Sequence, residues 1–389
     1  MTTYPRVYTD IRRSYVGARV TMRLPVDTEA ARKAAFPTWA GPAERLRHLL
    51  RYAILAPSRH NAQPWLFEIE GPEVRVYGDW RRALKVADPQ GRELVIACGA
   101  ATHNLEVAAQ HFGYASSVEI LAGARRDGLL ARLRLEERRS PTMEDEELFA
   151  AIPARRTNRF SFDSRDVPFG VVTALVREAA LQGGALRVVE RSMRPLVSEL
   201  VALGDRQQWS SPRFRSELAA WSRSNGPDEM DGMPGYAHGY SNSASVLHRV
   251  LVRLRTGLSG EERRDRQYAL NTRALLALCT RADTPAEWFV AGQTMQRILL
   301  RAASQGLSAS FFSQAIEVAP VRARLREALG ERGWPQLLFR LGFGRLARAT
   351  PRRPVDLVLR SMASASPDQS IVRPPDIEVD LALACGTKA

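Results

Sequence analysis

The chain has 389 residues, of which 45% are hydrophobic and 25% are charged, as expected for a globular protein of one large or two ordinary domains. No apolar run approaches the roughly 18 residues of a membrane helix, and the N-terminus has no hydrophobic signal core. We therefore expect a cytoplasmic protein without a membrane partner. Cys98, Cys279 and Cys385 lie too far apart for a zinc site or a disulfide framework, and we expect no bound metal.

The formal net charge is +14, yet only three of the 56 basic residues are lysines, namely Lys33, Lys85 and Lys388. The arginines are scattered among Asp and Glu instead of forming a basic run. No zinc finger and no RNA-binding motif accompanies them. The charge pattern therefore favours a small-molecule substrate and argues against a nucleic-acid partner.

In the first half of the chain, Leu46, Leu49, Leu50 and Ile54 lie at helical spacing and predict an amphipathic helix over 42–56. A polar segment, two short strands and a long helix follow. After them come two more strands and an acidic helix start. In chain order, the expected ranges are 66–70 and 74–77 for strands, 92–112 for the long helix, 117–121 and 130–135 for strands, and 144–150 for the last helix.

The second half repeats this order. Helical spacing returns over 172–180, and the strand-like LRVVE at 186–190 parallels LFEIE at 66–70. The long helix also has a counterpart, because AGQTMQRILLRAASQGLSAS (291–310) parallels CGAATHNLEVAAQHFGYASS (98–117). Two helices and a strand in the same order indicate an internal duplication.

Glycines mark both copies of the long helix. One glycine begins the apolar face and another ends it, at Gly99 and Gly113 in the first copy and at Gly292 and Gly306 in the second. We expect an α+β fold in which two related units, each with antiparallel or mixed sheets flanked by helices, pack as a pseudo-dimer within one chain. The expected units are 1–140, with an N-terminal extension, and 150–360.

Residues of about 205–250 have no counterpart in the first half. They are rich in Gly, Pro and aromatic residues, and long insertions of this kind often form lids or binding loops. We expect Met233, Tyr236 and Tyr240 to approach a ligand, with an external loop as the alternative. The tail of residues 361–389 is polar and rich in proline.

Two short segments concentrate arginines. PARRTNRF (153–160) holds Arg155, Arg156 and Arg159 around Thr157, and ATPRRPVD (349–356) holds two arginines between prolines. The planar donor fork of arginine suits phosphate, and a threonine hydroxyl adds a further donor. Solvated surface charge is the alternative for each segment taken alone.

Four segments together resemble the nitroreductase superfamily, and the duplicated pattern is most similar to its Acg-like, twin-domain branch. The segments are APSRHNAQPW (56–65), RRTNRF (155–160), GQTMQRILLRAASQGLSAS (292–310) and RLGFGRLARATPRRPVD (340–356). This resemblance implies an α+β flavoprotein that binds FMN in a cleft between two nitroreductase-like units.

The resemblance also implies roles for individual residues. The arginine motif of 155–159, which has threonine where the family usually has serine, would bind the FMN phosphate together with the arginine pair of 349–356. The serine loop, which lies within APSRHNAQPW (56–65), and the segment 308–317 would reach the ribityl chain and the ring. The residues implied to bind the cofactor are Ser58, Arg59, Asn61, Gln63, Trp65, Arg155, Arg156, Thr157, Arg159, Ser310, Phe311, Phe312, Ser313, Arg352 and Arg353.

The serine loop lies in the first unit and the arginine motif in the second, as one complete site across a pseudo-dimer interface requires. The reciprocal site is incomplete: ALQGGALRVV (180–189) has no serine, asparagine or tryptophan, and only Arg32 and Lys33 precede the first helix nearby. The arginine pair within 11–19 lies too far upstream. We therefore expect one FMN per chain, in a monomer or a weak homodimer.

Two other patterns carry less weight. Gly342, Gly344 and Ala347 match the spacing of a dinucleotide fingerprint, but the prolines that follow prevent the helix that such a site needs. His103 and His111 share a helix face without a third ligand, which favours a packed or surface pair over a metal site.

These patterns favour an FMN-dependent oxidoreductase that passes electrons from NAD(P)H or another reductant to a nitro compound, a quinone or a similar electron-poor molecule. The alternative is an FMN storage protein with a lidded flavin and little turnover. A tailoring enzyme that oxidises an azoline or a peptide is a third candidate. No side chain stands out as a general acid.

Overall fold

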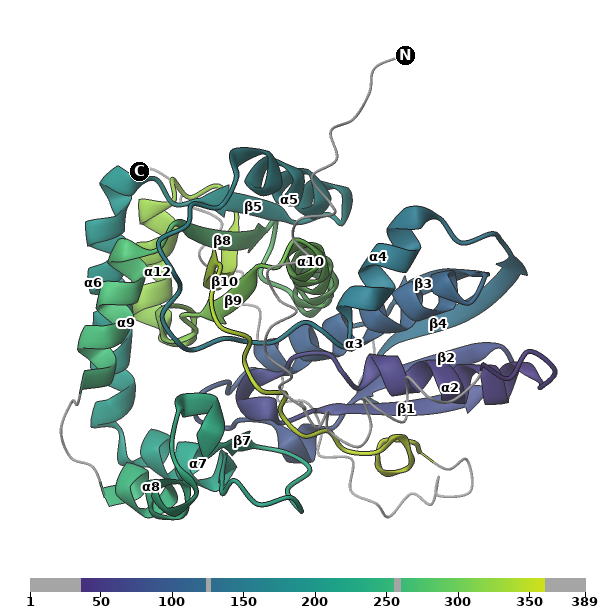
Figure 1. The fold of residues 1–389 in the computed structure, drawn as a ribbon, viewed down its shortest axis with the longest axis horizontal. Coiled ribbons are helices and arrows are strands. Elements are labelled where there is room, and N and C mark those ends of the chain that lie inside the picture. The colour runs from purple at the N-terminus through teal and green to yellow at the C-terminus, as the bar shows by residue number, and fades with distance from the viewer. Residues whose placement is uncertain (1–35, 124–126, 255–259, 361–389) are drawn as a thin grey trace, which may run out of the picture.

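The computed structural model describes residues 36–123, 127–254 and 260–360 (Figure 1). Its architecture is α+β, as predicted, with two four-stranded antiparallel sheets flanked by helices. Within these ranges, no helix combines the length and the apolar character needed to cross a membrane. The N-terminal segment 11–19, Arg32, Lys33 and the tail 361–389 lie outside the described residues.

The first sheet has the strand order β1-β2-β4-β3. Helices α2 and α3 pack on it, and α4 packs against α3. The predicted elements of this half are confirmed with small shifts at their ends. The elements are α2 (Pro42–Ala53), η1 (Arg59–Asn61), β1 (Trp65–Glu70), β2 (Glu73–Gly78), η2 (Trp80–Arg82), α3 (Arg92–His111), β3 (Tyr114–Ile120), β4 (Leu129–Arg138) and α4 (Met143–Ala151).

The second sheet has the strand order β5-β8-β10-β9. If the four strands of each sheet are counted along the chain, this order is the same as that of the first sheet. The elements are α5 (Phe169–Leu181), β5 (Ala185–Val188), η3 (Arg191–Met193), α6 (Arg194–Ser210), α7 (Pro212–Trp221), β6 (Ser222–Arg223), β7 (Met233–Pro234), η4 (Gly235–His238), α8 (Asn242–Leu254), α9 (Gly260–Asn271), β8 (Ala274–Thr280), α10 (Pro285–Ser304), β9 (Ser308–Phe311), α11 (Gln314–Glu317), α12 (Ala319–Ala328), β10 (Trp334–Gly342) and η5 (Val355–Leu357).

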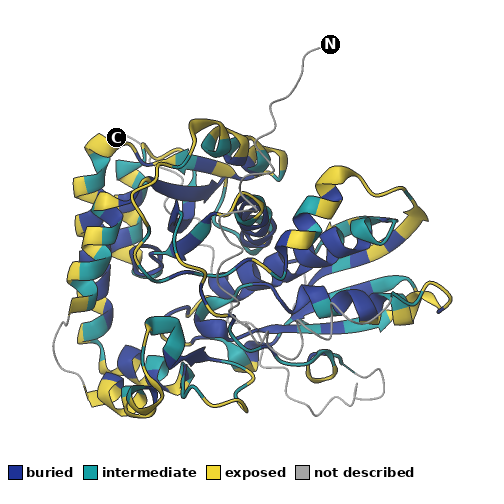
Figure 2. Cartoon of the chain, in the orientation of Figure 1, coloured by how far each residue is buried: buried dark blue, intermediate teal, exposed yellow. Residues whose placement is uncertain are grey.

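The long helices α3 and α10 pack against each other at the centre of the molecule, where Figure 2 shows α10 almost entirely buried. A Cβ atom added to Gly99 would lie 2.2 Å from the carbonyl oxygen of Phe289, so only glycine allows this approach. One hydrophobic core runs from α2 and β1 through both long helices to β8 and β10. The two halves therefore share a core.

Each half sends a segment to the other half's sheet. After β10, the chain crosses to the first sheet, where Phe67 of β1 accepts a backbone hydrogen bond from Arg360 and donates one to Val358 (Figure 1). In the other direction, the backbone N–H of Asn158 donates to the carbonyl of Ala309 in β9, 2.8 Å away. These crossings place 155–160 and 347–353 between the two sheets.

The insertion of about 205–250 is more helical than its composition suggested. It contains the end of α6, the whole of α7 and most of α8, and its longest stretch without helix or strand is 224–232. Ser211 caps α7 by accepting from the backbone N–H of Phe214, and Pro212 takes the first helical position, which tolerates proline. In Figure 1 these helices lie beside the loop that follows α2.

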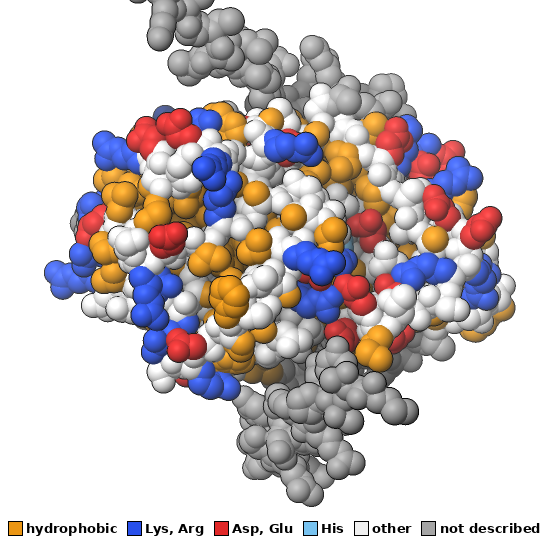
Figure 3. Space-filling model, turned by 90° about the horizontal axis from the view of Figure 1, so that it is seen from above, with side chains coloured by type: hydrophobic (Ala, Val, Ile, Leu, Met, Phe, Trp, Pro, Cys, Tyr) orange, Lys and Arg blue, Asp and Glu red, His pale blue; other side chains and the backbone are white. Residues whose placement is uncertain are grey.

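The surface agrees with the charge pattern of the sequence. On the face drawn in Figure 3, Lys and Arg side chains are interspersed with Asp and Glu, without one large basic patch.

Candidate functional site

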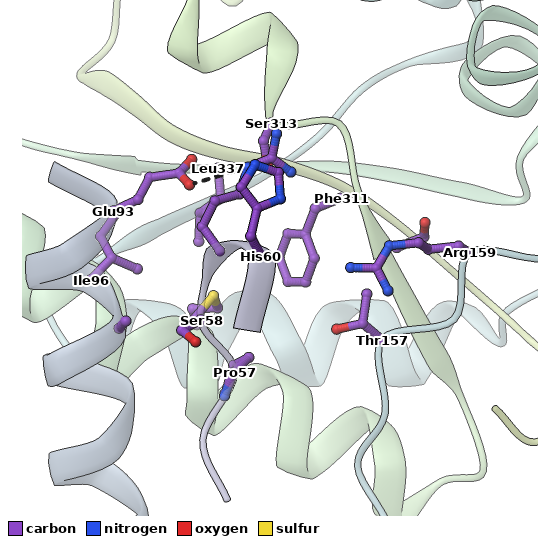
Figure 4. Close-up of a pocket in the computed structure, with 14 residues that line it drawn as sticks. Pro57, Ser58, His60, Glu93, Ile96, Thr157, Arg159, Phe311, Ser313 and Leu337 are labelled. Atoms are coloured by element: carbon purple, nitrogen blue, oxygen red, sulfur yellow. Dashed lines mark ion pairs between the residues drawn. The ribbon is translucent and has the colours of Figure 1, made fainter. Parts of the chain in front are cut away.

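Three adjoining cavities lie between the two halves. The central cavity, about 650 Å³ of open space and drawn in Figure 4, is lined by Pro57, Ser58, Arg59, His60, Glu93, Ile96, Ala97, Thr157, Arg159, Met295, Ser310, Phe311, Ser313 and Leu337. These residues come from the loop after α2 and from α3 in the first half, and from 157–159, α10, β9, β10 and Ser313 in the second half. The central cavity is therefore formed by both halves of the chain.

The arginine cavity opens beside it. It is lined by Pro57, Ser58, Asn61, Arg155, Arg156, Thr157, Arg159, Phe160, Met233, Tyr236, Ala237, Ala347, Arg348, Thr350 and Arg352. Asn61 of the first half and Arg159 of the second thus share one cavity. Five of the lining residues are arginines and, among the described residues that form its wall, none is Asp or Glu.

The positive charge of this cavity is poorly compensated. Arg155 is 5% exposed, its Nε has no partner in the described chain, and its guanidinium donates a long hydrogen bond to the carbonyl of Leu55 at 3.4 Å. Burial, followed by repulsion from Arg352 and Arg156, holds the pKa of Arg155 well below its usual value. Burial and Arg59 likewise lower the pKa of Arg159 to about 10. A dianion such as phosphate would relieve both effects.

The lid cavity adjoins the other two and measures about 880 Å³. It shares Arg59, His60, Arg159, Ser310 and Phe311 with the central cavity. Its remaining lining residues, mostly from the insertion and α9, are Asp205, Gln208, Trp209, Phe214, Leu218, Met233, His238, His248, Glu261, Arg264, Asp265, Tyr268, Phe312 and Gln314. Arg159 lines all three cavities.

The loop after α2 is held in an unusual backbone conformation. His60, Asn61 and Gln63 have φ angles of 50°, 54° and 50°, in the left-handed region that side chains other than glycine seldom adopt. Ser58 stabilises the turn, because its Oγ accepts from the backbone N–H of Gln63 at 2.8 Å. Strain of this kind persists only where surrounding contacts enforce it, and it is common at binding sites.

Asn61 and Gln63 supply those contacts. The Asn61 amide donates to the carbonyls of Gly232 and Pro351, both at 3.0 Å, and accepts from Arg352 at 3.0 Å. The Gln63 amide donates to the carbonyl of Met230 at 2.8 Å, and its oxygen accepts from the backbone N–H of Arg353 at 2.8 Å. The two side chains therefore join the loop to the insertion and to the segment after β10.

Most of the predicted site residues lie together. All of them except Gln63, Trp65, Arg353 and Tyr240 line at least one of the three cavities. Trp65 is fully buried in β1 within the hydrophobic core. The guanidinium of Arg353 donates to the carbonyls of Gln63 and Leu357. Tyr240 packs on His248, with ring centroids 4.4 Å apart.

The segment 308–317, which the resemblance implied to be a loop along the flavin, is not a loop. Ser308–Phe311 forms the edge strand β9, and Gln314–Glu317 forms the short helix α11. Ser310 and Phe311 nevertheless face both the central and the lid cavities, while Phe312 lines the lid cavity and Ser313 the central one. Side chains alternate in direction along a strand, so one strand end reaches two cavities.

Two of the three predicted lid residues, Met233 and Tyr236, line the arginine cavity. Met233 lines both the arginine and the lid cavity, and its sulfur accepts from Arg159 at 3.4 Å. The Tyr236 hydroxyl donates to the carbonyl of Ala349 at 2.8 Å, and the guanidinium of Arg348 stacks on its ring at 4.2 Å. The insertion thus closes this side of the site.

The sequence did not point to three residues of the cavities. Arg348 lies four residues before Arg352 and differs in no way from the other scattered arginines. Glu93, in the first turn of α3, faces the central cavity, where Figure 4 labels it. Burial and the neighbouring Glu317 raise the pKa of Glu93 to about 8. His60 was quoted as part of the serine loop but was not predicted to bind anything.

Arg59 is fixed between two carboxylates. Its Nε lies 2.6 Å from Glu317 and 3.7 Å from Glu93, and Glu317 also accepts from the amide of Gln208. This network connects the loop to α3, α6 and α11. The guanidinium of Arg59 is therefore held in a fixed position, where it lines the central and lid cavities.

The two histidines of α3 lie apart from the cavities. His103 is buried within reach of Glu106, and His111 stacks on Phe149 and pairs with Glu146. After Gly342 and Gly344 the chain is extended and no helix begins, so the dinucleotide-like spacing has no structural counterpart.

No protein-family model matches the chain. Over 331 residues the chain is 30% identical to a Mycobacterium tuberculosis protein named "Putative NAD(P)H nitroreductase Rv3131", and the match covers 84% of this chain and 94% of that protein. The chain belongs to the nitroreductase family. It is also 25% identical over 323 residues to the M. tuberculosis "Putative NAD(P)H nitroreductase acg", covering 82% of this chain and 96% of that protein. The expected membership of this nitroreductase branch is confirmed.

Among solved structures, the nitroreductase NfnB from Mycobacterium smegmatis, described as FMN-dependent and in complex with NADPH, is similar at 15% identity and a TM-score of 0.36. That match covers 56% of this chain and 98% of the other chain.

Proposed function

We propose that this nitroreductase-family chain is an FMN-dependent oxidoreductase, which passes electrons from NAD(P)H or another donor to an electron-poor small molecule such as a nitro compound or a quinone. When bound, FMN would supply the redox chemistry, and the protein would supply binding, orientation and electrostatics. The observation that carries the proposal is the arginine cavity, five guanidinium groups without a lining carboxylate, beside a central cavity formed by both halves.

The arginine cavity suits the phosphate of FMN. The arginine cavity draws its cations from two separate segments. Arg155 and Arg156 come from one and Arg352 from the other, and Thr157 lines the same cavity. A buried arginine such as Arg155, which has no acidic partner among the described residues, is costly, because desolvation of the cation is not repaid by a counter-charge. A phosphate dianion would provide that counter-charge and accept several charge-assisted hydrogen bonds.

The central cavity suits the flavin ring. Its apolar surface comes from Ile96, Ala97, Met295, Phe311 and Leu337. Its polar surface comes from residues that can donate to ring oxygens and nitrogens, namely Ser58, Thr157, Arg159, Ser310 and Ser313. Predominantly apolar walls with a few placed polar groups are typical of small-molecule sites.

We further propose that the chain is an internal duplication, with units 1–140 and 150–360, an insertion at about 205–250 and a tail at 361–389. The identical strand order of the two sheets supports this proposal. The contact between the long helices supports it too, because Gly99 approaches the Phe289 carbonyl and Gly292 approaches the Ile96 carbonyl. Reciprocal contacts of this kind are typical of a twofold axis.

On this proposal the chain binds one FMN. The serine loop and the arginine motif meet at a single inter-unit site, while the position that corresponds to the serine loop in the second unit falls at the end of α5 and the start of β5. A monomer is then sufficient for a complete site.

The test is the flavin content of the purified protein. We expect a yellow protein with about one FMN per chain, and loss of FMN when Arg156→Ala and Arg159→Ala are combined. Each lost charge-assisted hydrogen bond costs about 1.5–3 kcal/mol, which is roughly tenfold or more in affinity. Arg165→Ala is the control, because Arg165 lies in the same segment but pairs with Asp163 at the surface. A flavin content that stays unchanged in the double variant would contradict the proposal.

A further inference from the structure

Buried imidazole nitrogens without hydrogen-bond partners in the described chain line the lid cavity. His60 is 3% exposed, lines both the central and the lid cavities, and neither of its ring nitrogens has a hydrogen-bond partner among the described residues. The Nε2 atom of His238, in η4 of the insertion, is also buried without a partner and lines the lid cavity. Buried polar atoms are nearly always satisfied in folded proteins, so these nitrogens indicate a missing ligand.

The backbone holds His60 in this position at a cost. Its φ of 50° lies in the left-handed region, and the neighbouring amides of Asn61 and Gln63 enforce the turn. In Figure 4, the His60 ring lies beside Phe311 at the edge of the central cavity. The loop therefore presents an unsatisfied imidazole at the boundary between the two cavities.

The charges around these imidazoles favour an anion. Burial, followed by repulsion from Arg59 and Arg159, lowers the pKa of His60 well below its usual value. Burial and Arg159 do the same to the pKa of His238, with further contributions from His248, Arg264 and Arg59. A positive potential that opposes protonation of an imidazole attracts a negatively charged ligand for the same reason.

The acidic residues of the lid cavity do not cancel this potential at the imidazoles. They come from α6 and α9, whereas His60 and His238 come from η1 and η4. Burial and Asp265 raise the pKa of Asp205 to about 8, so this carboxyl is mostly neutral at neutral pH. The Nε of Arg264 lies 3.2 Å from Asp265, and Gln314 donates to both aspartates. The acidic side is thus largely neutralised and retains acceptor oxygens.

The cavity also offers aromatic surface. Trp209, Phe214 and Tyr268 line it from the insertion and α9, and Phe311 and Phe312 line it from the strand end. Aromatic rings bind planar ligands through stacked or edge contacts. A space of about 880 Å³ is within the usual range of small-molecule sites.

We propose that the lid cavity is the substrate subsite and that it takes a planar aromatic carboxylate, whose oxygens accept hydrogen bonds from His60 and His238. A hydroxyl or amino group at the other end of the ring would donate to the acidic side formed by α6 and α9. This inference rests on the proposed function, in which the adjoining central cavity holds the flavin.

The test is calorimetric titration of the FMN-loaded full chain, without reductant, with 4-hydroxybenzoate and with its neutral analogue 4-hydroxybenzamide. We expect the carboxylate to bind about tenfold or more tightly than the amide, the difference that one charge-assisted hydrogen bond provides. Equal affinities, or no binding of either probe at millimolar concentration, would overturn the proposal.

Variants of His238 locate the subsite. His238→Phe removes one of the two proposed donors and should clearly reduce the preference for the carboxylate, since only the His60 bond remains. His238→Gln keeps a neutral donor and should keep most of that preference, which guards against misfolding of the Phe variant. His111→Gln is the matched control, because His111 lies outside the three cavities beside Glu146. A preference that survives unchanged in His238→Phe would contradict this location.

Proton uptake gives a second readout. A bound anion offsets the arginine potential and raises the pKa of both imidazoles, so affinity should rise as the pH falls from about 7.5 to about 5.5. Asp205 is already protonated over most of this pH range. The other titratable or charged groups that face the imidazoles are Arg59, Arg159, His248, Tyr240, Glu261, Arg264, Asp265 and Tyr268. His238→Gln should take up fewer protons than the unaltered chain. Equal uptake in the two proteins would overturn the role of His238.

The proposed function and the subsite fail in different ways. A protein that takes up no FMN contradicts the proposed function, and calorimetry still reports on the subsite because it needs no flavin signal. An FMN-loaded protein without preference for the carboxylate contradicts the subsite alone.

Discussion

Gly99 of α3 and Gly292 of α10 each lie against the backbone of the other helix. A Cβ on Gly99 would lie 2.2 Å from the carbonyl oxygen of Phe289, and a Cβ on Gly292 would lie 2.0 Å from the carbonyl oxygen of Ile96. Each glycine therefore contacts the residue three positions before the other. This contact brings the two sheets, and with them both walls of the central cavity, to a fixed separation.

Replacing either glycine by alanine should destabilise the protein. The added methyl group meets a backbone carbonyl, which cannot rotate away, so the helices must separate. Overpacking in a core typically costs about 1–3 kcal/mol, and we expect Gly292→Ala to lower the free energy of unfolding by at least that amount. Urea-induced unfolding followed by circular dichroism measures the change.

Gly170→Ala is the matched control. Gly170 lies in the first turn of the exposed helix α5, and a Cβ there meets nothing within 4 Å. Alanine in a helix is favoured over glycine by roughly 0.5–1 kcal/mol, so this variant should be neutral or slightly stabilised. A Gly292→Ala protein as stable as Gly170→Ala would show that the helix contact is looser than described.

The sequence predicts the parts of this molecule whose signals are local. Periodic apolar residues identify α2, α3 and α10, because helix burial repeats every three to four positions. The insertion was harder, since its glycines and prolines suggested loops. Pro212 in fact begins α7, a position at which proline supports a helix.

The residues of the site likewise divide into those with a local sequence signal and those without one. Motif spacing identified the arginines of 155–159 and 352 and the serine loop, but not the tertiary partners of Asn61 and Gln63. Their amides bind the backbones of Gly232 and Met230, more than 150 residues away, and no local pattern encodes such pairing. The unsatisfied nitrogens of His60 are likewise visible only once its surroundings are known.

Gln63→Ala should loosen the insertion. The change leaves the carbonyl of Met230 and the backbone N–H of Arg353 without their side-chain partner, and each buried group left unsatisfied costs about 1–3 kcal/mol. We expect faster amide hydrogen exchange over 230–240 and faster proteolytic cleavage there, with little change in α3 and α10. Mass spectrometry of exchanged peptides measures both regions in one experiment.

Gln207→Ala provides the comparison, because Gln207 is exposed on α6 close to the insertion. It should exchange like the unaltered protein over 230–240. If amide exchange over 230–240 is equally slow in both glutamine variants, the amide of Gln63 does not anchor the insertion.

The buried carboxyl of Asp205 should make stability depend on pH. Its pKa rises from 3.8 to about 8 on folding, chiefly because of burial and then because of Asp265. The folded state therefore binds a proton that the unfolded state releases, and stability from this group is lost as the pH rises from about 4 through about 8. Asp205→Asn removes that dependence and should gain stability relative to the unaltered chain at higher pH.

Urea unfolding at about pH 5.5, 7 and 8.5 measures this effect. Each unit of pKa shift corresponds to about 1.4 kcal/mol, so the gain of Asp205→Asn at the highest pH should exceed 1 kcal/mol. Asn also preserves the acceptor oxygen for the amide of Gln314. Parallel pH profiles of the two proteins would mean that Asp205 is ionised in the folded state.

Turnover and storage of the flavin differ in how the bound cofactor responds to a nicotinamide. Under anaerobic conditions, we expect NADH or NADPH to bleach the flavin absorbance within seconds. The reason is that the lid cavity, about 880 Å³ and adjoining the central cavity at the shared residues His60, Ser310 and Phe311, leaves space for a donor and then for an acceptor. A storage protein would remain yellow with both nicotinamides and bleach only with dithionite. In that case Met233, which lies on Arg159, would act as a cover over the site, and shortening it with Met233→Ala should restore reduction by the nicotinamide.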